Sequence, residues 1–221
     1  GASIKSENAE IVSRLLTKTR SLQSEINAHS KLSEKISRDR INSSLEEFEI
    51  KVDKALGYIE LIRDSESEIS TLNDQLKALT RIAPLGIPLD LMSGYDGVEI
   101  YLAETAKSSK AKDAFSDIIR DVELKVAKGI IAVACRPKDG AAVQIALAEL
   151  GSKAVQIPSG EGTPDSRISS TQKSIEEYES TISSSKQSLE DWSSNNGSML
   201  VAVLEHLERD CLLYTSPSPR D

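Results

Sequence analysis

The sequence predicts an α+β protein, in which a long antiparallel helical coiled coil carries an inserted ferredoxin-like (βαββαβ) lobe at its tip. Three observations lead to this fold class. Glycine and proline concentrate in the middle and the tail of the chain, heptad patterns run through the segments on either side, and the middle changes to short alternating runs. The expected parts are a first helical segment at 4–82, the lobe at 83–160 and a returning helix at 163–210.

The first helical segment contains one glycine, Gly57, and no proline between Ile4 and Thr80. Ser44 and Glu47 have the spacing of a capping box, so the pattern leaves open whether this segment is one helix or two. Seam residues recur at alternating spacings of three and four, as in a coiled coil with two polar interruptions: Leu45, Phe48, Val52, Ala55, Ile59, Ile62, Glu66, Ile69, Asn73 and Leu76.

The returning helix is expected to begin at Thr163 and Pro164, where a polar cap precedes a proline in the first turn. Residues 195–197, Asn-Asn-Gly, predict a break near its end. One narrow stripe on a polar helix requires a partner, and the first segment can supply it in antiparallel orientation. The stripe consists of Ile168, Thr171, Ile175, Tyr178, Ile182, Ser185, Leu189 and Trp192.

The lobe is predicted from a change of period. Alternating or continuous apolar runs indicate strands, and 3.6-residue patterns indicate two helices between them. Their order is that of a split βαβ unit. The expected strands are 98–102, 122–126, 129–135 and 154–157, with helices at 110–120 and 139–150.

Composition narrows the function classes. The 221 residues carry a net charge of −8, which argues against broad contact with nucleic acid or an anionic membrane face. No apolar run has membrane-spanning length, and a soluble, cytosolic fragment is expected. Residues 1–3 resemble the remnant of a removed tag, and 211–221, with Cys211 and Tyr214, resembles translated vector sequence. The natural segment stops in mid-pattern, so it is expected to be a piece of a longer protein.

Residues that could carry chemistry are few, and we expect no catalytic, cofactor or metal site. His29 and His206 lie in separate helical segments without neighbouring Cys or paired His. Cys135 sits in the most apolar strand, where a small core residue is the simpler interpretation than a nucleophile. The glycine-containing linker at 159–162 lacks the preceding strand and following basic residue of a phosphate loop.

The segment that joins the first helix to the lobe, 79–101, is the most informative. Pro84 stops a helix, Gly86 permits a tight bend, and apolar residues follow before the strand. Its motif residues are Pro84, Leu85, Gly86, Gly94 and Tyr95. In these positions the segment resembles subunit I of archaeal A-type ATP synthases, a relative of subunit a of V-type ATPases.

The resemblance implies a structural role in ATP synthesis or proton transport. In that family the N-terminal half is a cytoplasmic arm with two α/β lobes joined by a coiled coil, and the C-terminal half is a membrane domain. The chain would be a non-catalytic stator arm of a rotary proton-translocating ATPase, at the cytoplasmic face of the membrane. It would link the V0-type ion-channel sector to the peripheral stalk and resist rotor torque. Its partners would be stalk subunits E and G or H and the membrane domain of its own full-length chain.

Partner contacts can be placed only loosely from the sequence. Met92 and Tyr95 are candidates, because Met and exposed aromatics often anchor interfaces, but packing inside the lobe is an equal alternative. A different class of function is also compatible with the pattern: a coiled-coil hinge or dimerisation module of a chromosome-organising or other scaffold protein. The sequence leaves open the oligomeric state, the direction of the reaction, and proton against sodium transport.

Overall fold

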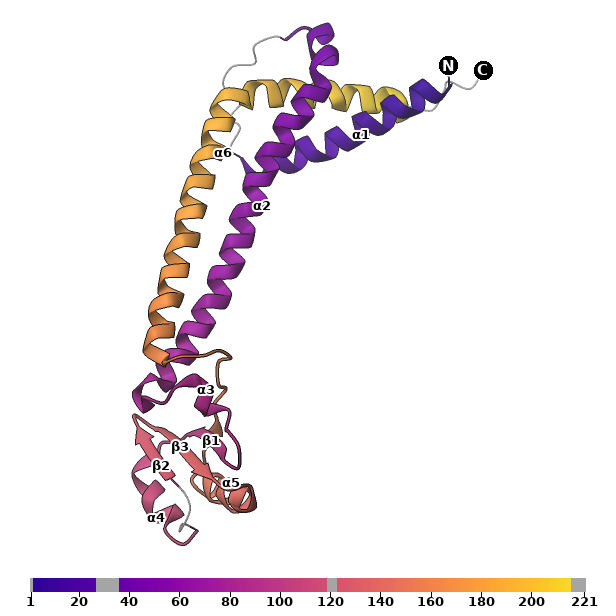
Figure 1. The fold of residues 1–221 in the computed structure, drawn as a ribbon. Coiled ribbons are helices and arrows are strands. Elements are labelled where there is room, and N and C mark those ends of the chain that lie inside the picture. The colour runs from indigo at the N-terminus through magenta and orange to yellow at the C-terminus, as the bar shows by residue number, and fades with distance from the viewer. Residues whose placement is uncertain (1, 27–35, 119–122, 216–221) are drawn as a thin grey trace. The chain divides into compact units, whose positions relative to one another are not determined.

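The computed structural model describes residues 2–26, 36–118 and 123–215 (Figure 1). The chain divides into two compact units. We call Gly1–Ser67 with Tyr178–Asp221 the helical unit, and Glu68–Glu177 the α/β unit. Two long helices, α2 (Arg38–Ile82) and α6 (Pro164–Thr215), each run through parts of both.

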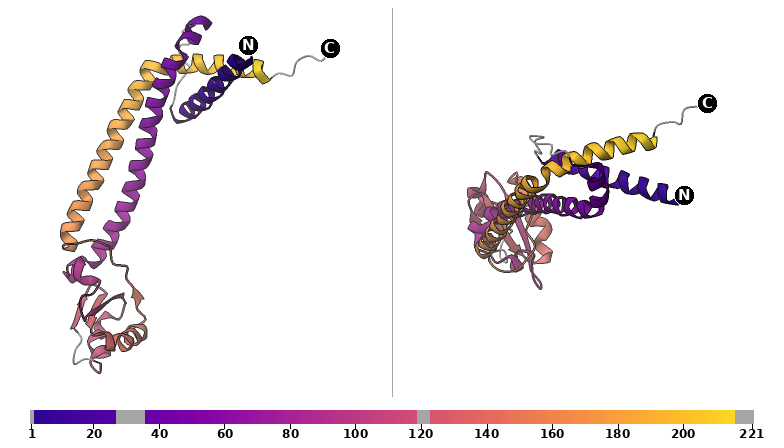
Figure 2. Two further views of the ribbon diagram at one scale, coloured as in Figure 1. Left: turned by 45° about the vertical axis from the view of Figure 1, so that its right-hand side comes forward. Right: turned by 90° about the horizontal axis from the view of Figure 1, so that it is seen from above.

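The helical unit contains α1 (Ala2–Glu25) and the outer parts of α2 and α6. In all three views α1 lies beside the C-terminal part of α6 (Figures 1 and 2), and an ion pair of 3.5 Å joins Arg20 to Glu208. All three helices contribute to one apolar core, so α1 completes it. Its members include Leu15, Leu22, Phe48, Val52, Ala55, Trp192, Leu200 and Leu207.

The first helical segment is two helices, which answers the question that the sequence left open. The Ser37 hydroxyl accepts the backbone N–H of Arg40 at 3.3 Å, as an N-cap does. Ser44 lies inside α2, where its hydroxyl donates to the Arg40 carbonyl at 2.6 Å. The capping box predicted at Ser44 is therefore wrong, because Ser37 caps the start of α2 seven residues earlier.

The α6 seam follows the predicted heptad. Thr171, Ser185 and Trp192 are buried, and the other predicted positions are partly buried. In α2 the seam agrees at every predicted position except two, with Ile69 and Leu76 partly buried as predicted. At the first exception it moves by one residue, so that Ser65 is buried and Glu66 is exposed.

The same shift recurs one heptad later, where Leu72 is partly buried and Asn73 is exposed. The prediction of Glu66 and Asn73 as seam residues was therefore wrong. A carboxylate costs several kcal/mol to bury without a partner, whereas a small hydroxyl or a leucine does not.

The break predicted at 195–197 is absent, because α6 is continuous through these residues. Figure 1 instead shows α6 bending in its C-terminal half. The side-chain amide of Asn196 donates to the Trp192 carbonyl at 3.1 Å and so competes with the main-chain ladder, which is a known cause of bending. The helix extends through residue 215, and 216–221 lie outside the described residues.

The α/β unit holds a four-stranded sheet in the order β2-β3-β1-β4. Its pairs β1·β3, β2·β3 and β1·β4 are all antiparallel. Because β3 lies between β1 and β2, the order is that of a split βαβ unit. The α+β fold class is confirmed. The elements are β1 (Glu99–Glu104), α4 (Ala111–Phe115), β2 (Glu123–Ala127), β3 (Ile130–Cys135), α5 (Gly140–Glu149) and β4 (Lys153–Ala154), with single 3-10 turns at Ser108–Lys110 and Pro137–Asp139.

Strand β3 is buried on both faces, since alternate residues point to opposite sides of the sheet. One face carries Ile131 and Val133 and packs against α4 and α5. The other face carries Ile130 and Ala132 and packs against the end of α2 and the residues that follow it. The connecting segment is thereby fixed to the sheet by its own core: Leu79, Ile82, Leu85, Leu89, Met92 and Leu102.

Candidate functional site

The segment 79–101 forms one side of the α/β unit, and we call it the motif segment. It contains the end of α2, a 3-10 turn η1 (Ala83–Leu85), the short helix α3 (Leu89–Met92) and the start of β1. The five motif residues predicted from the sequence all lie in it.

The Pro84-Leu85-Gly86 part ends the long helix. Pro84 lies in the first turn of η1, where a missing backbone N–H is tolerated. Gly86 adopts φ +62°, and its N–H donates to the Ala83 carbonyl at 3.0 Å. Leu85 is fully buried between this turn and the sheet. The motif thus turns the chain while anchoring it to the lobe.

The Gly94-Tyr95 part forms a tight turn before β1. Tyr95 and Val98 exchange two main-chain hydrogen bonds, of 3.1 and 2.8 Å. Gly94 has φ +85°, and a Cβ at this position would lie 2.8 Å from the Val98 carbonyl oxygen. Only glycine satisfies both the backbone angle and this approach. Gly97, with φ +74°, closes the turn in open space.

The two candidate contact residues have opposite environments. Met92 is 0% exposed, in the core beneath β1, so the interpretation as a packed lobe residue is correct for it and a direct partner contact is not available. Tyr95 is 54% exposed, and Leu91, three residues before Gly94, is 40% exposed. Because the hydrogen bonds of Tyr95 use its main chain, its ring is free to contact another molecule.

Sequence reasoning missed a polar pair at the start of β1. The Tyr101 hydroxyl donates to Glu99 Oε2 at 2.6 Å, and this hydrogen bond, with burial, raises the pKa of Tyr101 to about 12. A Cβ on Gly140 would lie 2.7 Å from both the carboxylate and the hydroxyl. Gly140 therefore lets α5 begin against the pair. An i, i+2 spacing on a strand places both side chains on one face, which was the available signal.

The other residues with possible chemistry are dispersed. Burial raises the pKa of the Cys135 thiol, which suits a core residue. His206 Nε2 lies 2.9 Å from Asn42 Oδ1 and 3.4 Å from Asp210 Oδ2. His29 lies outside the described residues. Across the part of the chain that the structure describes, no three His, Cys, Asp or Glu side chains group as metal ligands.

The linker at 159–162 ends in a helix cap. The Thr163 hydroxyl accepts the Ser166 N–H at 3.2 Å, as predicted for the start of α6. The Gly162 carbonyl accepts the Leu89 N–H at 2.9 Å, so the linker bonds to α3. None of the described helices combines the length and apolar character that crossing a membrane would require.

Comparison with known proteins returns no matching family model. The chain is similar to the A-type ATP synthase subunit I of Archaeoglobus fulgidus, with 26% identity over 181 residues. The match covers 76% of this chain and 26% of that protein, so the chain spans about a quarter of its relative.

A solved structure gives the likeness in fold. It is the crystal structure of the cytoplasmic N-terminal domain of subunit I, homolog of subunit a, of V-ATPase, with a TM-score of 0.62 and 12% identity. The match covers 96% of this chain and 72% of that one. The resemblance to subunit I is confirmed. At this identity the solved structure establishes the fold alone.

Proposed function

We propose that this chain is a stator arm of a rotary A/V-type ATPase and plays a mechanical rather than a catalytic role. It would connect the membrane sector of its complex, at the cytoplasmic face, to the peripheral stalk and resist rotor torque. The observation that carries the proposal is the shared architecture with the cytoplasmic domain of subunit I, together with the sequence likeness to an archaeal subunit I.

The construction of α2 and α6 supports a mechanical role. They have 45 and 52 residues and keep a nearly continuous seam of buried or partly buried residues within each unit. Bending either helix requires separating side chains along that seam, so the free-energy cost is spread over many contacts.

We place the contact with stalk subunits E and G or H on the exposed residues of the motif segment. Only six large apolar residues are exposed among those described, and two of them, Leu91 and Tyr95, fall within five positions of each other. Exposed aromatics are frequent anchors of protein interfaces. Tyr95 is held on a turn that Gly94 fixes, which reduces the entropy lost on binding.

Binding to a purified E–G heterodimer from the same organism tests the proposal, with calorimetry on the whole chain. Saturable one-to-one binding is expected. Tyr95→Ala should weaken it by roughly tenfold or more, the loss of a hot-spot side chain. Ile145→Ala is the matched control, since Ile145 is an apolar residue of the same unit that is 62% exposed on α5.

Two results would count against the stator role. One is the absence of binding to the heterodimer. The other is stable self-association that depends on residues 84–158, which would favour the hinge or dimerisation module. Binding with equal loss in the Tyr95 and Ile145 variants would keep the stator role but move the contact away from the motif segment.

A further inference from the structure

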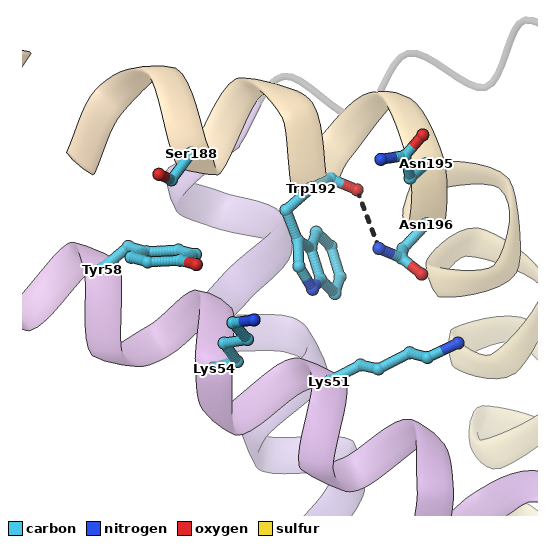
Figure 3. A pocket seen from close by; sticks show the side chains of 7 residues that line it. All are labelled: Lys51, Lys54, Tyr58, Ser188, Trp192, Asn195 and Asn196. Carbon is cyan, nitrogen blue, oxygen red and sulfur yellow. Dashed lines mark hydrogen bonds between the residues drawn. The ribbon is translucent and has the colours of Figure 1, made fainter. Parts of the chain in front are cut away.

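A hollow in the helical unit is lined by several hydrogen-bond donors, and one of them, the Trp192 indole N–H, has no acceptor among the described residues (Figure 3). It lies between α2 and α6 and has a volume of about 300 Å³. None of its lining residues is acidic, although the chain as a whole has 35 acidic and 27 basic residues. The lining consists of Lys51, Lys54, Tyr58, Ser188, Trp192, Asn195 and Asn196.

The central group is the indole of Trp192. Trp192 is 6% exposed, and its indole Nε1 is buried without a hydrogen-bond partner among the described residues. Figure 3 shows the ring turned toward α2, with the nitrogen on the side of the two lysines. A buried N–H without an acceptor destabilises the folded chain, so an acceptor supplied by a bound ligand would remove that penalty.

The two lysines add charge at the same place. Lys51 and Lys54 project from α2, and Lys54 extends toward the indole ring (Figure 3). Neither ammonium forms an ion pair within the described part of the chain, whereas Lys18 on α1 pairs with two carboxylates. The acidic residue that directly precedes Trp192, Asp191, accepts a hydrogen bond from the Gln187 side-chain amide at 3.0 Å.

The donor set selects the class of ligand. An indole nitrogen can only donate, and an ammonium carries three donors and no acceptor. The amide of Asn196 already donates to the Trp192 carbonyl, which fixes the helix around the ring. Three donors with two positive charges complement a tetrahedral oxyanion, and lysine is a common phosphate ligand. Since one water occupies about 30 Å³, the volume leaves room for such an anion with several waters.

We propose that this hollow binds a phosphate group, either as inorganic phosphate or as a small phosphate monoester. The anion enters between the lysines, and the flexible Lys54 side chain moves to admit it to the indole N–H. The site is independent of the proposed stalk contact, because its residues lie in the helical unit and the motif segment lies in the α/β unit.

Trp192 is the single tryptophan of the chain, so its fluorescence reports on this hollow alone. Titration with sodium phosphate at constant ionic strength should give a saturable change in emission, while chloride gives none. Glycerol phosphate in place of phosphate distinguishes an ester from the free ion, and saturation with either supports the site. No saturable change with either, or an equal response to acetate, would overturn the proposal.

Variants locate the binding. The double substitution Lys51→Gln and Lys54→Gln should abolish saturation, and Lys173→Gln, an exposed lysine elsewhere on α6, should leave it unchanged. Trp192→Phe keeps an aromatic ring without the donor and should weaken binding by roughly tenfold in calorimetry, as expected for losing one hydrogen bond to a charged group. Wild-type affinity in Trp192→Phe, with helical content intact by circular dichroism, would exclude the indole from the site.

Discussion

The two units are stabilised by different kinds of interaction. In the helical unit, three helices share one apolar core, and its buried members come from α1, α2 and α6. In the α/β unit, a thin sheet separates two smaller cores, one under α4 and α5 and one under the motif segment. The helical unit therefore depends on repeated side-chain contacts, whereas the α/β unit depends on a few backbone positions that only certain residues can occupy.

The difference shows in the kinds of residue that each unit cannot replace. Gly94, Gly86 and Gly140 of the α/β unit each occupy a left-handed angle, a close approach, or both. In the helical unit Gly57 and Gly197 would meet no atom closer than 3.8 Å. We therefore expect substitutions at turn glycines to destabilise the α/β unit most, and substitutions of buried seam residues to destabilise the helical unit most.

The largest expected effects come from the two phenylalanines, one in each unit. Phe115 is 0% exposed in the α/β unit, and Phe48 is 3% exposed in the helical unit. Replacing either by alanine should lower the free energy of unfolding by about 3–5 kcal/mol, from lost burial and a residual cavity. Hydrogen exchange read by mass spectrometry should show the loss of protection mainly in the unit that contains the substitution.

This experiment tests whether the units are separate in stability. Ile145→Ala, at an exposed position, is the control and should change protection little. Equal loss of protection in both units for Phe115→Ala and Phe48→Ala would mean that the chain unfolds as one, and that α2 and α6 transmit the damage.

The next largest effect is a backbone effect in the α/β unit. Gly94→Ala should cost about 2 kcal/mol or more, because it adds a left-handed angle penalty to a 2.8 Å contact with the Val98 carbonyl. Gly97→Ala has a similar φ in open space and should cost only about 1 kcal/mol. Urea denaturation of the pair measures the difference, and equal losses would show that the turn relaxes around the added methyl group.

The fold could be predicted from the sequence because its signals are local. A heptad in α6, a strand run at 130–135 and the Pro84-Gly86 helix end each follow from a few neighbouring residues. The two seam positions at which Ser65 and Leu72 replace Glu66 and Asn73 did not follow, since each depends on which of two adjacent residues the partner helix can bury. A choice between Ser65 and Glu66 is made by tertiary burial, which spacing alone does not contain.

Of the two candidate sites, the motif segment could be predicted from the sequence and the hollow around Trp192 could not. The glycines of the motif segment are readable, because glycine at a predicted turn indicates a left-handed angle. The donors around Trp192 were not predicted, since they come from two helices more than a hundred residues apart. Trp192 has the spacing of an ordinary seam residue, and only its unpaired nitrogen distinguishes it.

A smaller effect of opposite sign is expected along the seam. Thr171 is 5% exposed on α6, and Thr171→Val exchanges a buried hydroxyl for a methyl group of similar shape. Helix propensities of the two residues are close, so the free energy of unfolding should rise by roughly 0.5–1 kcal/mol. Thr80→Val, at an exposed position on α2, should give no gain. A loss in Thr171→Val would show that the hydroxyl has a bonding role that fixes register.

The smallest effect concerns the attachment of α1 to α2, where charge rather than packing is tested. Arg14 donates to both carboxylate oxygens of Glu49, at 2.9 and 3.0 Å, and Lys18 lies 2.9 Å from the same group. The hydrogen bond from Arg14, followed by that from Lys18, lowers the pKa of Glu49 below its usual 4.5. The folded chain therefore gains stability from ionised Glu49 above that value and loses it as pH falls through the lowered pKa.

Glu49→Gln removes this contribution and tests whether the stability from Glu49 is lost as the pH falls. At pH 7 the variant should melt slightly below the wild type, and the gap should close as the pH falls below 4.5 and through the lowered pKa of Glu49, where the wild-type carboxylate also becomes neutral. Raising the salt concentration at pH 7 should narrow the gap as well, because Arg14 is half exposed and its charge is screened. A gap of constant size across this pH range would mean that Glu49 acts through packing, and that the helical unit joins α1 by apolar contacts alone.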